Sequence, residues 1–166
     1  MEGRGAMSLA IVPGSFDPIT VGHVDVIERT ARMFDTVVVA VMMNDQKEYR
    51  FTIEQRAQLA KISCAHIPNV KVLVSEGMLV DVVKELGATA IVKGVRTVKD
   101  FRYEQEMAYY NRAKNPKAET LYLPCSSEYK RISSTLARKL MDEGRSLKGV
   151  LMPDAIRKIE TGFDIK

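Results

Sequence analysis

The residues best suited to chemistry lie at positions 13–23, in the stretch Pro-Gly-Ser-Phe-Asp-Pro-Ile-Thr-Val-Gly-His. Gly14 and Gly22 allow a ligand to approach the backbone closely, and N–H groups at the start of a helix attract anions. The same helix end disfavours a second positive charge on His23, so we expect a neutral imidazole that donates one hydrogen bond to a phosphate oxygen. Taken singly, a turn glycine and a capping histidine would carry no function. The whole stretch favours an anion site.

Cations follow two later apolar runs. Lys47 comes shortly after the β-branched run 36–43, while Lys93 and Arg96 come directly after the run 89–92. A single loop lysine is more often solvated than functional, but cations gathered beside an anion site are typical phosphate ligands. These cations therefore favour a site that binds phosphate.

Hydroxyl side chains follow the last apolar run. Ser133, Ser134 and Thr135 open a helix, where serine is a common N-cap and where hydroxyl and N–H groups also bind phosphates. Tyr129 precedes them, and both contact with a ligand and packing at the surface stay open for its ring.

These stretches need a scaffold that brings them together. Strand-length apolar runs lie at 9–12, 36–43, 70–74, 89–92 and 120–123. Stretches of helical period lie between or after them, at 23–34, 52–62, 78–86, 100–113, 134–141 and from 153 onward. This alternation predicts an α/β protein with a single-domain Rossmann-like fold, a five-stranded parallel sheet and helices on both faces. Ligands of such sheets bind beyond the carboxyl ends of the strands, near the point where the strand order reverses.

Local signals refine the boundaries of these elements. Pro13-Gly14 is expected to stop the first strand. Thr52 with Gln55 three residues later is a capping-box pattern, and Asp100 is expected to cap the long helix that follows it.

The composition fits this scaffold. The chain has 166 residues, 46% hydrophobic and 28% charged, which is ordinary for one globular domain. Its net charge of +4 is spread among acids without a basic block, so we expect no nucleic-acid partner. No apolar run approaches the roughly 20 residues of a membrane span. Cys64 and Cys125 lie outside metal-ligand spacing and are expected to be small buried hydrophobes of a reducing compartment.

Two of the stretches are recognisable. Residues 14–23, Gly-Ser-Phe-Asp-Pro-Ile-Thr-x-Gly-His, resemble the first motif of the nucleotidyltransferases related to class I aminoacyl-tRNA synthetases. Residues 132–135, Ile-Ser-Ser-Thr, resemble their second signature. Over about residues 9–153 the chain is similar to the phosphopantetheine adenylyltransferase family. On this basis residues 1–7 are expected to be a disordered tail or a cloning remnant, and residues 8–166 the nucleotidyltransferase domain.

The resemblance implies a reaction and a set of site residues. The reaction is adenylyl transfer from ATP to 4′-phosphopantetheine, which yields dephospho-coenzyme A and pyrophosphate. His23, Lys47 and Arg96 would be catalytic. The residues implied for ATP are Ser15, Phe16, Gly22, His23, Arg96, Glu104, Tyr129, Ser133, Ser134 and Thr135. Those implied for the acceptor are Ser15, Lys47, Leu79, Lys93 and Asn111.

The resemblance also implies partners and surroundings. Mg²⁺ would be held by substrate oxygens and water rather than by protein ligands. The chain would form a homohexamer in the cytoplasm, with coenzyme A as a feedback inhibitor. The sequence departs from the family pattern at two positions. Many relatives carry Arg at the Lys93 position, and lysine keeps the charge but cannot form the bidentate hydrogen bonds of arginine to a phosphate. Relatives commonly carry Pro near Asp45, and its absence here leaves the stiffness of that loop open.

Three alternatives remain. A sister nucleotidyltransferase, acting on nicotinate mononucleotide or an alcohol phosphate, would share the first and last motifs. A nucleotide-binding regulator without catalysis would need the glycines but not His23, Lys47 and Arg96 together. A nucleic-acid-binding module would rest on the net charge alone. The spelling of the first motif at Thr20 and the block 93–104 favour the phosphopantetheine acceptor.

Overall fold

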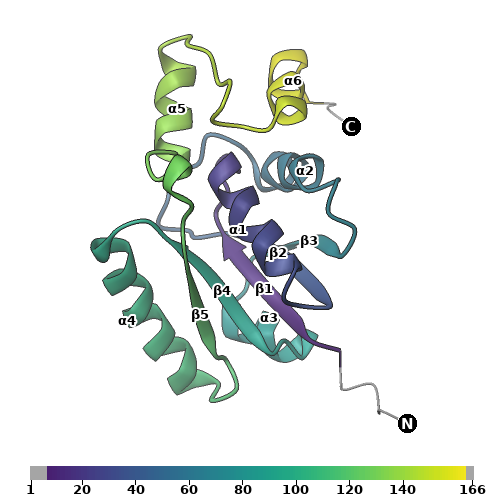
Figure 1. The fold of residues 1–166 in the computed structure, drawn as a ribbon, viewed down its shortest axis with the longest axis vertical. Coiled ribbons are helices and arrows are strands. Elements are labelled where there is room, and N and C mark those ends of the chain that lie inside the picture. Colours follow the sequence, from purple (N-terminus) through teal and green to yellow (C-terminus); the bar gives the residue numbers. More distant parts are fainter. Residues whose placement is uncertain (1–6, 164–166) are drawn as a thin grey trace.

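Five parallel strands form the central sheet, in the order β3-β2-β1-β4-β5 (Figure 1). They are β1 (Leu9–Gly14), β2 (Thr36–Met42), β3 (Val70–Ser75), β4 (Ala90–Val95) and β5 (Thr120–Pro124). The computed structural model describes residues 7–163. Of the tail predicted over residues 1–7, only Met7 falls within the described residues, and it is exposed and outside any regular element.

Helices follow the strands as predicted. They are α1 (Val21–Ala31), α2 (Ile53–Ser63), α3 (Leu79–Leu86), α4 (Val98–Lys114), α5 (Ser134–Asp142) and α6 (Pro153–Thr161), with a 3₁₀ turn η1 (Ser127–Tyr129) before α5. Helices α1 and α2 pack on one face of the sheet and α3 on the other. On the α3 face, α4 lies along β4 and β5 (Figure 1), where the Phe101 and Tyr122 rings meet edge to face. The predicted α/β class is confirmed.

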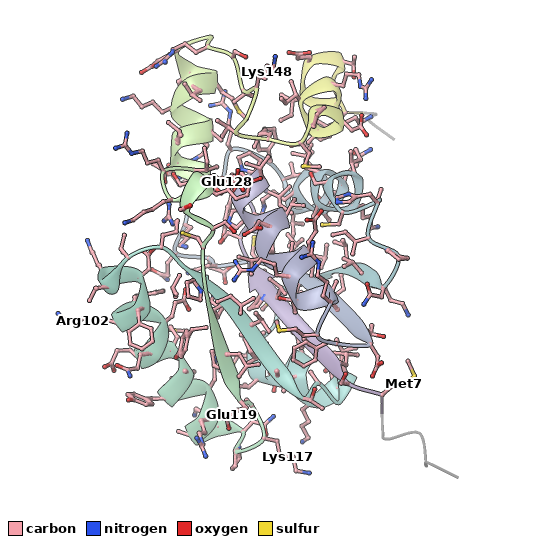
Figure 2. The ribbon with its side chains drawn as sticks, viewed as in Figure 1. Met7, Arg102, Lys117, Glu119, Glu128 and Lys148 are labelled. Carbon is pink, nitrogen blue, oxygen red and sulfur yellow. The ribbon has the colours of Figure 1, made fainter. Side chains whose placement is uncertain are left out.

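The apolar run of β2 shows why the strands could be predicted from the sequence. Val37, Val39 and Val41 point into the cluster beneath α1 and α2, whereas Val38 and Ala40 point into the cluster beneath α3. A strand covered on both faces needs apolar side chains at every position. Charged side chains such as Arg102, Lys117 and Lys148 point outward from the periphery (Figure 2).

The prediction that Pro13-Gly14 ends the first strand is wrong, because β1 continues through Gly14. The backbone N–H of Thr89, just before β4, donates to the carbonyl of Leu9. In a strand, the backbone N–H and C=O groups of every second residue point to the same neighbouring strand, so those of alternate residues from Leu9 to Pro13 point toward β4. The register between β1 and β4 ends at Ile11. Proline is tolerated there because its missing N–H faces a place where the ladder has already ended.

Two helix starts also differ from the prediction. Helix α1 begins at Val21, and Thr20 is its N-cap, so His23 is the third helical residue. Helix α4 is capped by Thr97, whose hydroxyl accepts from the backbone N–H of Asp100. Asp100 was therefore wrongly expected to be the cap, since Thr and Asp are both good caps and their spacing fits either. The capping box at Thr52 is confirmed.

The strand order reverses between β1 and β4, and there the strands diverge. β1 pairs with β2 as far as Gly14 and Val41, but with β4 only at Ala10 and Ile11. The carboxyl ends of β1 and β4 therefore separate at the switch point of the sheet. This is where ligands bind in open α/β sheets.

Helices α5 and α6 lie beyond this carboxyl edge (Figure 1). They enclose a small apolar cluster of their own, and α6 also packs against the cluster under α2. Among residues 7–163, no helix is long and apolar enough to span a bilayer.

Replacing Gly94 by alanine should destabilise the fold by roughly 1–3 kcal/mol through overpacking. Helix α1 crosses β4 so closely that a Cβ on Gly94 would lie 2.8 Å from Cγ2 of Val26. Urea unfolding measures the change. Gly77→Ala is the matched control, since its Cβ would meet Ser75 Oγ at an ordinary 3.8 Å. Equal stabilities for the two variants would contradict the close approach.

Candidate active site

A cleft of about 440 Å³ opens at the switch point. It brings together the start of α1, the end of β4, the first two turns of α4 and the segment from β5 to α5. The residues predicted for ATP that line it are Gly22, His23, Arg96, Glu104, Tyr129, Ser133, Ser134 and Thr135. Segments more than a hundred residues apart in the chain thus meet around one cavity.

His23 has a defined tautomer in this cleft. The backbone N–H of Thr20 donates to its Nδ1 over 3.0 Å, which completes the capping box of α1. Because a backbone N–H can only donate, Nδ1 carries no proton and the ring proton of the neutral form lies on Nε2. Burial, followed by the charges of Arg96 and Lys93, lowers the pKa of His23 to about 4. The side chain is therefore a neutral hydrogen-bond donor at pH 7.

This pKa predicts how stability depends on pH. The pKa of His23 lies below the value of 6.5 for an unperturbed histidine, so the unfolded chain binds the extra proton between pH 6.5 and 4. The contribution of neutral His23 to the free energy of unfolding is fully present above pH 6.5, and it is lost as the pH falls from 6.5 to 4. Between pH 7 and pH 5 the loss should be about 2 kcal/mol, measured by urea unfolding.

His23→Gln is the control for that prediction. Glutamine at the third helical position retains the capping box and does not titrate. The difference in unfolding free energy between the wild type and His23→Gln should therefore shrink from pH 7 to pH 5. A constant difference would mean that His23 titrates normally.

Arg96 is held at the mouth of the cleft by two contacts. Its Nη1 donates to the carbonyl of Ile132 over 3.2 Å, and its Nε lies 3.4 Å from the carboxylate of Asp100. Asp100 also accepts from the backbone N–H of Arg96. These contacts fix a cation beside His23, and the guanidinium has further N–H donors that they do not use.

Lys93 and Glu104 form an ion pair across the cleft wall. Their side chains lie 3.1 Å apart and are both largely buried. Glu104 lines the cleft, whereas Lys93 lies outside its lining. An acceptor phosphate at Lys93 would have to share this cation with Glu104.

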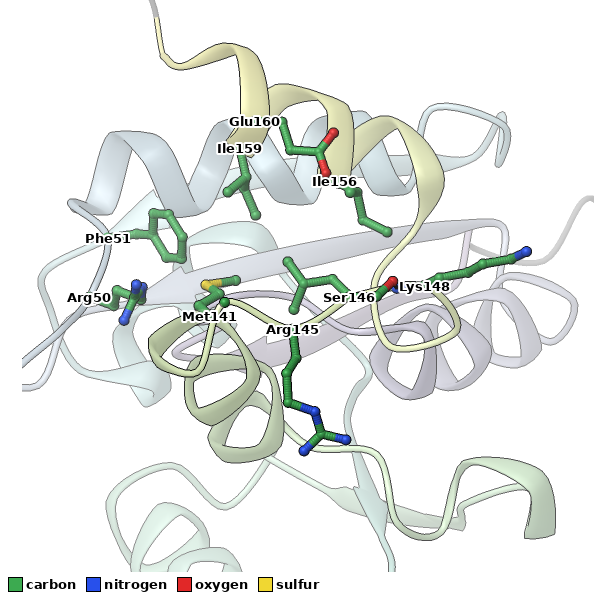
Figure 3. Close-up of a pocket in the computed structure, with 11 residues that line it drawn as sticks. Arg50, Phe51, Met141, Arg145, Ser146, Lys148, Ile156, Ile159 and Glu160 are labelled. Carbon is green, nitrogen blue, oxygen red and sulfur yellow. Dashed lines mark hydrogen bonds between the residues drawn. The ribbon is translucent and has the colours of Figure 1, made fainter.

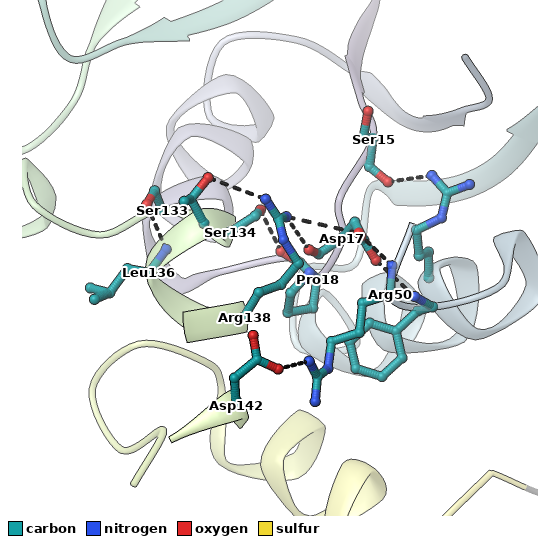
Figure 4. Close-up of polar contacts among 12 residues, drawn as sticks. Ser15, Asp17, Pro18, Arg50, Ser133, Ser134, Leu136, Arg138 and Asp142 are labelled. Carbon is teal, nitrogen blue, oxygen red and sulfur yellow. Dashed lines mark hydrogen bonds and ion pairs between the residues drawn. The ribbon is translucent and has the colours of Figure 1, made fainter. Parts of the chain in front are cut away.

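The serines of the last motif are already engaged (Figure 4). Ser133 accepts from the backbone N–H of Leu136 and so caps α5, while the Ser134 hydroxyl donates to the carbonyl of Pro18 over 2.8 Å. The Ser133 hydroxyl therefore stabilises the start of α5, and the Ser134 hydroxyl fastens α5 to the first motif. The first N–H groups of α5, which have no acceptor within the helix, are the better groups for a phosphate.

The loop of the first motif is also fixed by contacts with the segment before α2 and with α5. The carboxylate of Asp17 accepts from the backbone N–H groups of Arg50 and Phe51, and Arg138 donates to the Asp17 carbonyl over 2.7 Å (Figure 4). Phe16 has left-handed backbone with φ 48°. Its buried ring meets the His23 imidazole edge to face at 5.2 Å. The loop is thus held by contacts of its buried side chains Phe16 and Asp17.

Six of the predicted residues do not line the cleft: Ser15, Phe16, Lys47, Leu79, Lys93 and Asn111. Lys47 is exposed in the loop after β2, at the same carboxyl edge as the cleft. Leu79 begins α3 at that edge, and Asn111 is buried in α4. Their roles toward an acceptor stay predictions.

Several lining residues were not predicted. Thr20, Lys99 and Tyr103 line the cleft, and the available signals were the place of Thr20 within the first motif and of the other two within the block 93–104. Cys125 also lines it and is half-buried, so the expectation of a fully buried thiol is wrong there. For Cys64 that expectation is confirmed, and burial raises its pKa to about 12.

A second cavity, of about 570 Å³, lies between α5, α6 and the start of α2 (Figure 3). Its wall is apolar at Phe51, Met141 and Ile159 and cationic at Arg145 and Lys148. It contains none of the residues predicted for ATP or the acceptor. The smaller cleft is therefore the candidate active site.

The fold and the cleft agree with comparisons to known proteins. Residues 11–140 match the family model described as cytidylyltransferase-like, so the chain is by class a nucleotidyltransferase. Phosphopantetheine adenylyltransferase of Symbiobacterium thermophilum is 44% identical over 157 residues, which cover 95% of this chain and 97% of that protein. The protein of the same name from Actinobacillus succinogenes is 46% identical over 134 residues, covering 81% and 83%. The chain belongs to the phosphopantetheine adenylyltransferase family, as its motifs predicted.

A solved structure shares the fold. It is described as a nicotinate-nucleotide adenylyltransferase from Vibrio parahaemolyticus and superposes with a TM-score of 0.69, covering 92% of this chain and 91% of that one. At 20% identity the likeness concerns the fold alone.

Proposed function

We propose that this chain transfers the adenylyl group of ATP to the phosphate of 4′-phosphopantetheine, forming dephospho-coenzyme A and pyrophosphate in coenzyme A biosynthesis. One observation carries the proposal. His23, Arg96 and the first turn of α5 open onto a single cleft at the switch point of the sheet. Membership of the phosphopantetheine adenylyltransferase family supports the choice of acceptor.

The reaction asks for little proton chemistry. An oxygen of the acceptor phosphate attacks the α-phosphorus of ATP, and the bond from that phosphorus to the oxygen bridging to the β-phosphate breaks. The attacking phosphate is already anionic at neutral pH, so no strong base is needed. The protein must instead align the two phosphates and stabilise the charge that develops on the α-phosphate and the leaving pyrophosphate.

The cleft residues suit that task. His23 would donate from Nε2 to an α-phosphate oxygen, because its Nδ1 already accepts from Thr20. Arg96 and the free N–H groups at the start of α5 would bind the β- and γ-phosphates. Tyr129 and Glu104 would meet the nucleoside.

The acceptor would enter from the β1 and β2 side. Lys47 and Lys93 would bind its phosphate, with a backbone or hydroxyl donor at Ser15. Leu79 and Asn111 would line the pantetheine arm. Lys47 follows β2, which neighbours β1 in the sheet, so it lies on the opposite side of the first motif from Arg96.

Mg²⁺ would arrive on the triphosphate, since this ion loses its water reluctantly and prefers phosphate and water oxygens. Residues 7–163 contain no group of three His, Cys, Asp or Glu side chains that could hold a metal ion. We further propose a homohexamer in the cytoplasm that coenzyme A inhibits. Exposed apolar side chains on α4, such as Tyr103, Met107 and Tyr110, are suited to subunit contact.

The test is an assay of pyrophosphate release. The protein is mixed with ATP, Mg²⁺ and one acceptor at a time: 4′-phosphopantetheine, nicotinate mononucleotide or glycerol 3-phosphate. We expect release with 4′-phosphopantetheine only, and dephospho-coenzyme A as the co-product. Release with nicotinate mononucleotide instead would make the chain a sister enzyme and overturn the proposed acceptor.

A further inference from the structure

A buried arginine outside every motif joins two loops of the proposed acceptor site. Arg56, in the first turns of α2, has no exposed surface. Its Nη1 donates to the carbonyl of Ser15 over 2.7 Å and to the carbonyl of Met42 over 3.0 Å. One guanidinium thus ties the first residue after β1 to the last residue of β2 (Figure 4 shows the bond to Ser15).

The same guanidinium supports the loop that carries Lys47. It lies face-on over the ring of Tyr49, with its carbon 3.9 Å from the ring centroid. Such stacking is favourable when the cation is removed from water. Arg56 therefore stacks on the ring of Tyr49 while it donates a hydrogen bond to Ser15.

Tyr49 in turn closes the loop. Its hydroxyl accepts from the backbone N–H of Asn44 over 2.9 Å. The same hydroxyl donates to the Asn44 carbonyl over 3.4 Å. Asn44 accepts two more bonds, from the backbone N–H of Gln46 at its side chain and from that of Lys47 at its carbonyl, both 2.9 Å. Lys47 is fixed at its backbone through Asn44, although its side chain is exposed.

The contacts form one continuous support from Lys47 through Asn44, Tyr49 and Arg56 to Ser15. We propose that Arg56 and Tyr49 are positioning residues that set Lys47 and Ser15 against the acceptor phosphate; this inference rests on the proposed function. The support involves none of the groups that line the ATP cleft.

The support predicts an effect on one substrate only. Tyr49→Phe removes both bonds between the hydroxyl and Asn44 but keeps the ring stacked on Arg56. The KM for 4′-phosphopantetheine should rise about fivefold, the usual effect of losing one hydrogen bond of normal length, since the 3.4 Å bond is weak. The KM for ATP should change less than twofold. Tyr109→Phe, the same change at an exposed site on α4, should alter neither.

A double-mutant cycle separates positioning from general loosening. Lys47→Ala removes the group that the support holds, so adding Tyr49→Phe to it should change kcat/KM for the acceptor by less than twofold. A full fivefold effect in the Lys47→Ala background, or equal changes in the two KM values, would overturn the inference.

Amide exchange tests the support without any substrate. In Tyr49→Phe the amide of Asn44 should exchange at least about tenfold faster than in the wild type, while amides of β4 keep their rates. Unchanged exchange at Asn44 would overturn the inference even if the enzyme is active. If the wild type adenylylates a different phosphate acceptor, the proposed function fails and the cycle is run with that acceptor.

Discussion

Replacing His23 by alanine should lower kcat by roughly 10²–10³-fold, the usual cost of losing one donor to the transition state. The imidazole is neutral because its pKa is about 4, and its proton lies on Nε2 because Nδ1 accepts from Thr20. The capping box uses Nδ1 of His23 and the hydroxyl of Thr20, so the Nε2–H donor is available to a ligand. Pyrophosphate release at saturating ATP and acceptor measures the change, and circular dichroism checks the fold.

His23→Gln distinguishes the donor from the cap. Glutamine retains the capping box, so the variant should recover about 1 kcal/mol of stability relative to His23→Ala. Its kcat should nevertheless stay at least about tenfold below that of the wild type, because its amide replaces the Nδ1 acceptor rather than the Nε2 donor. Near-normal turnover in a folded His23→Ala protein would refute the role of His23.

The fold was predictable where local pattern and burial agree. The β-branched run of β2 is apolar at every position because the sheet is covered on both faces. The boundaries at Pro13 and Thr97 were not predictable, because they depend on where a neighbouring strand stops and on which of two good caps is used. The strand-end rule placed the cleft correctly, since the motif residues that follow β1, β4 and β5 line it.

The roles of individual polar groups were less predictable. Nothing in the sequence indicates that the hydroxyl of Ser134 is used by Pro18, 116 positions away. Likewise Arg56 lies among polar neighbours of an ordinary helix, where an arginine is normally solvated. Its burial depends on carbonyls that two other segments bring to it. Contacts of this kind arise from tertiary structure, and hydrophobic periodicity carries no trace of them.

Replacing Arg56 by methionine should therefore destabilise the protein by about 3 kcal/mol, because it leaves the carbonyls of Ser15 and Met42 without this donor while opening little space. Urea unfolding measures the loss. Arg102→Met is the matched control, the same change at an exposed position of α4, and should shift stability by less than about 0.5 kcal/mol. A buried guanidinium is itself costly to desolvate, so the sign of the result decides between two views. A loss near 3 kcal/mol means that the hydrogen bonds outweigh desolvation and that Arg56 stabilises the junction of the two loops. A gain in stability would mean that the chain retains this arginine at a cost to its fold.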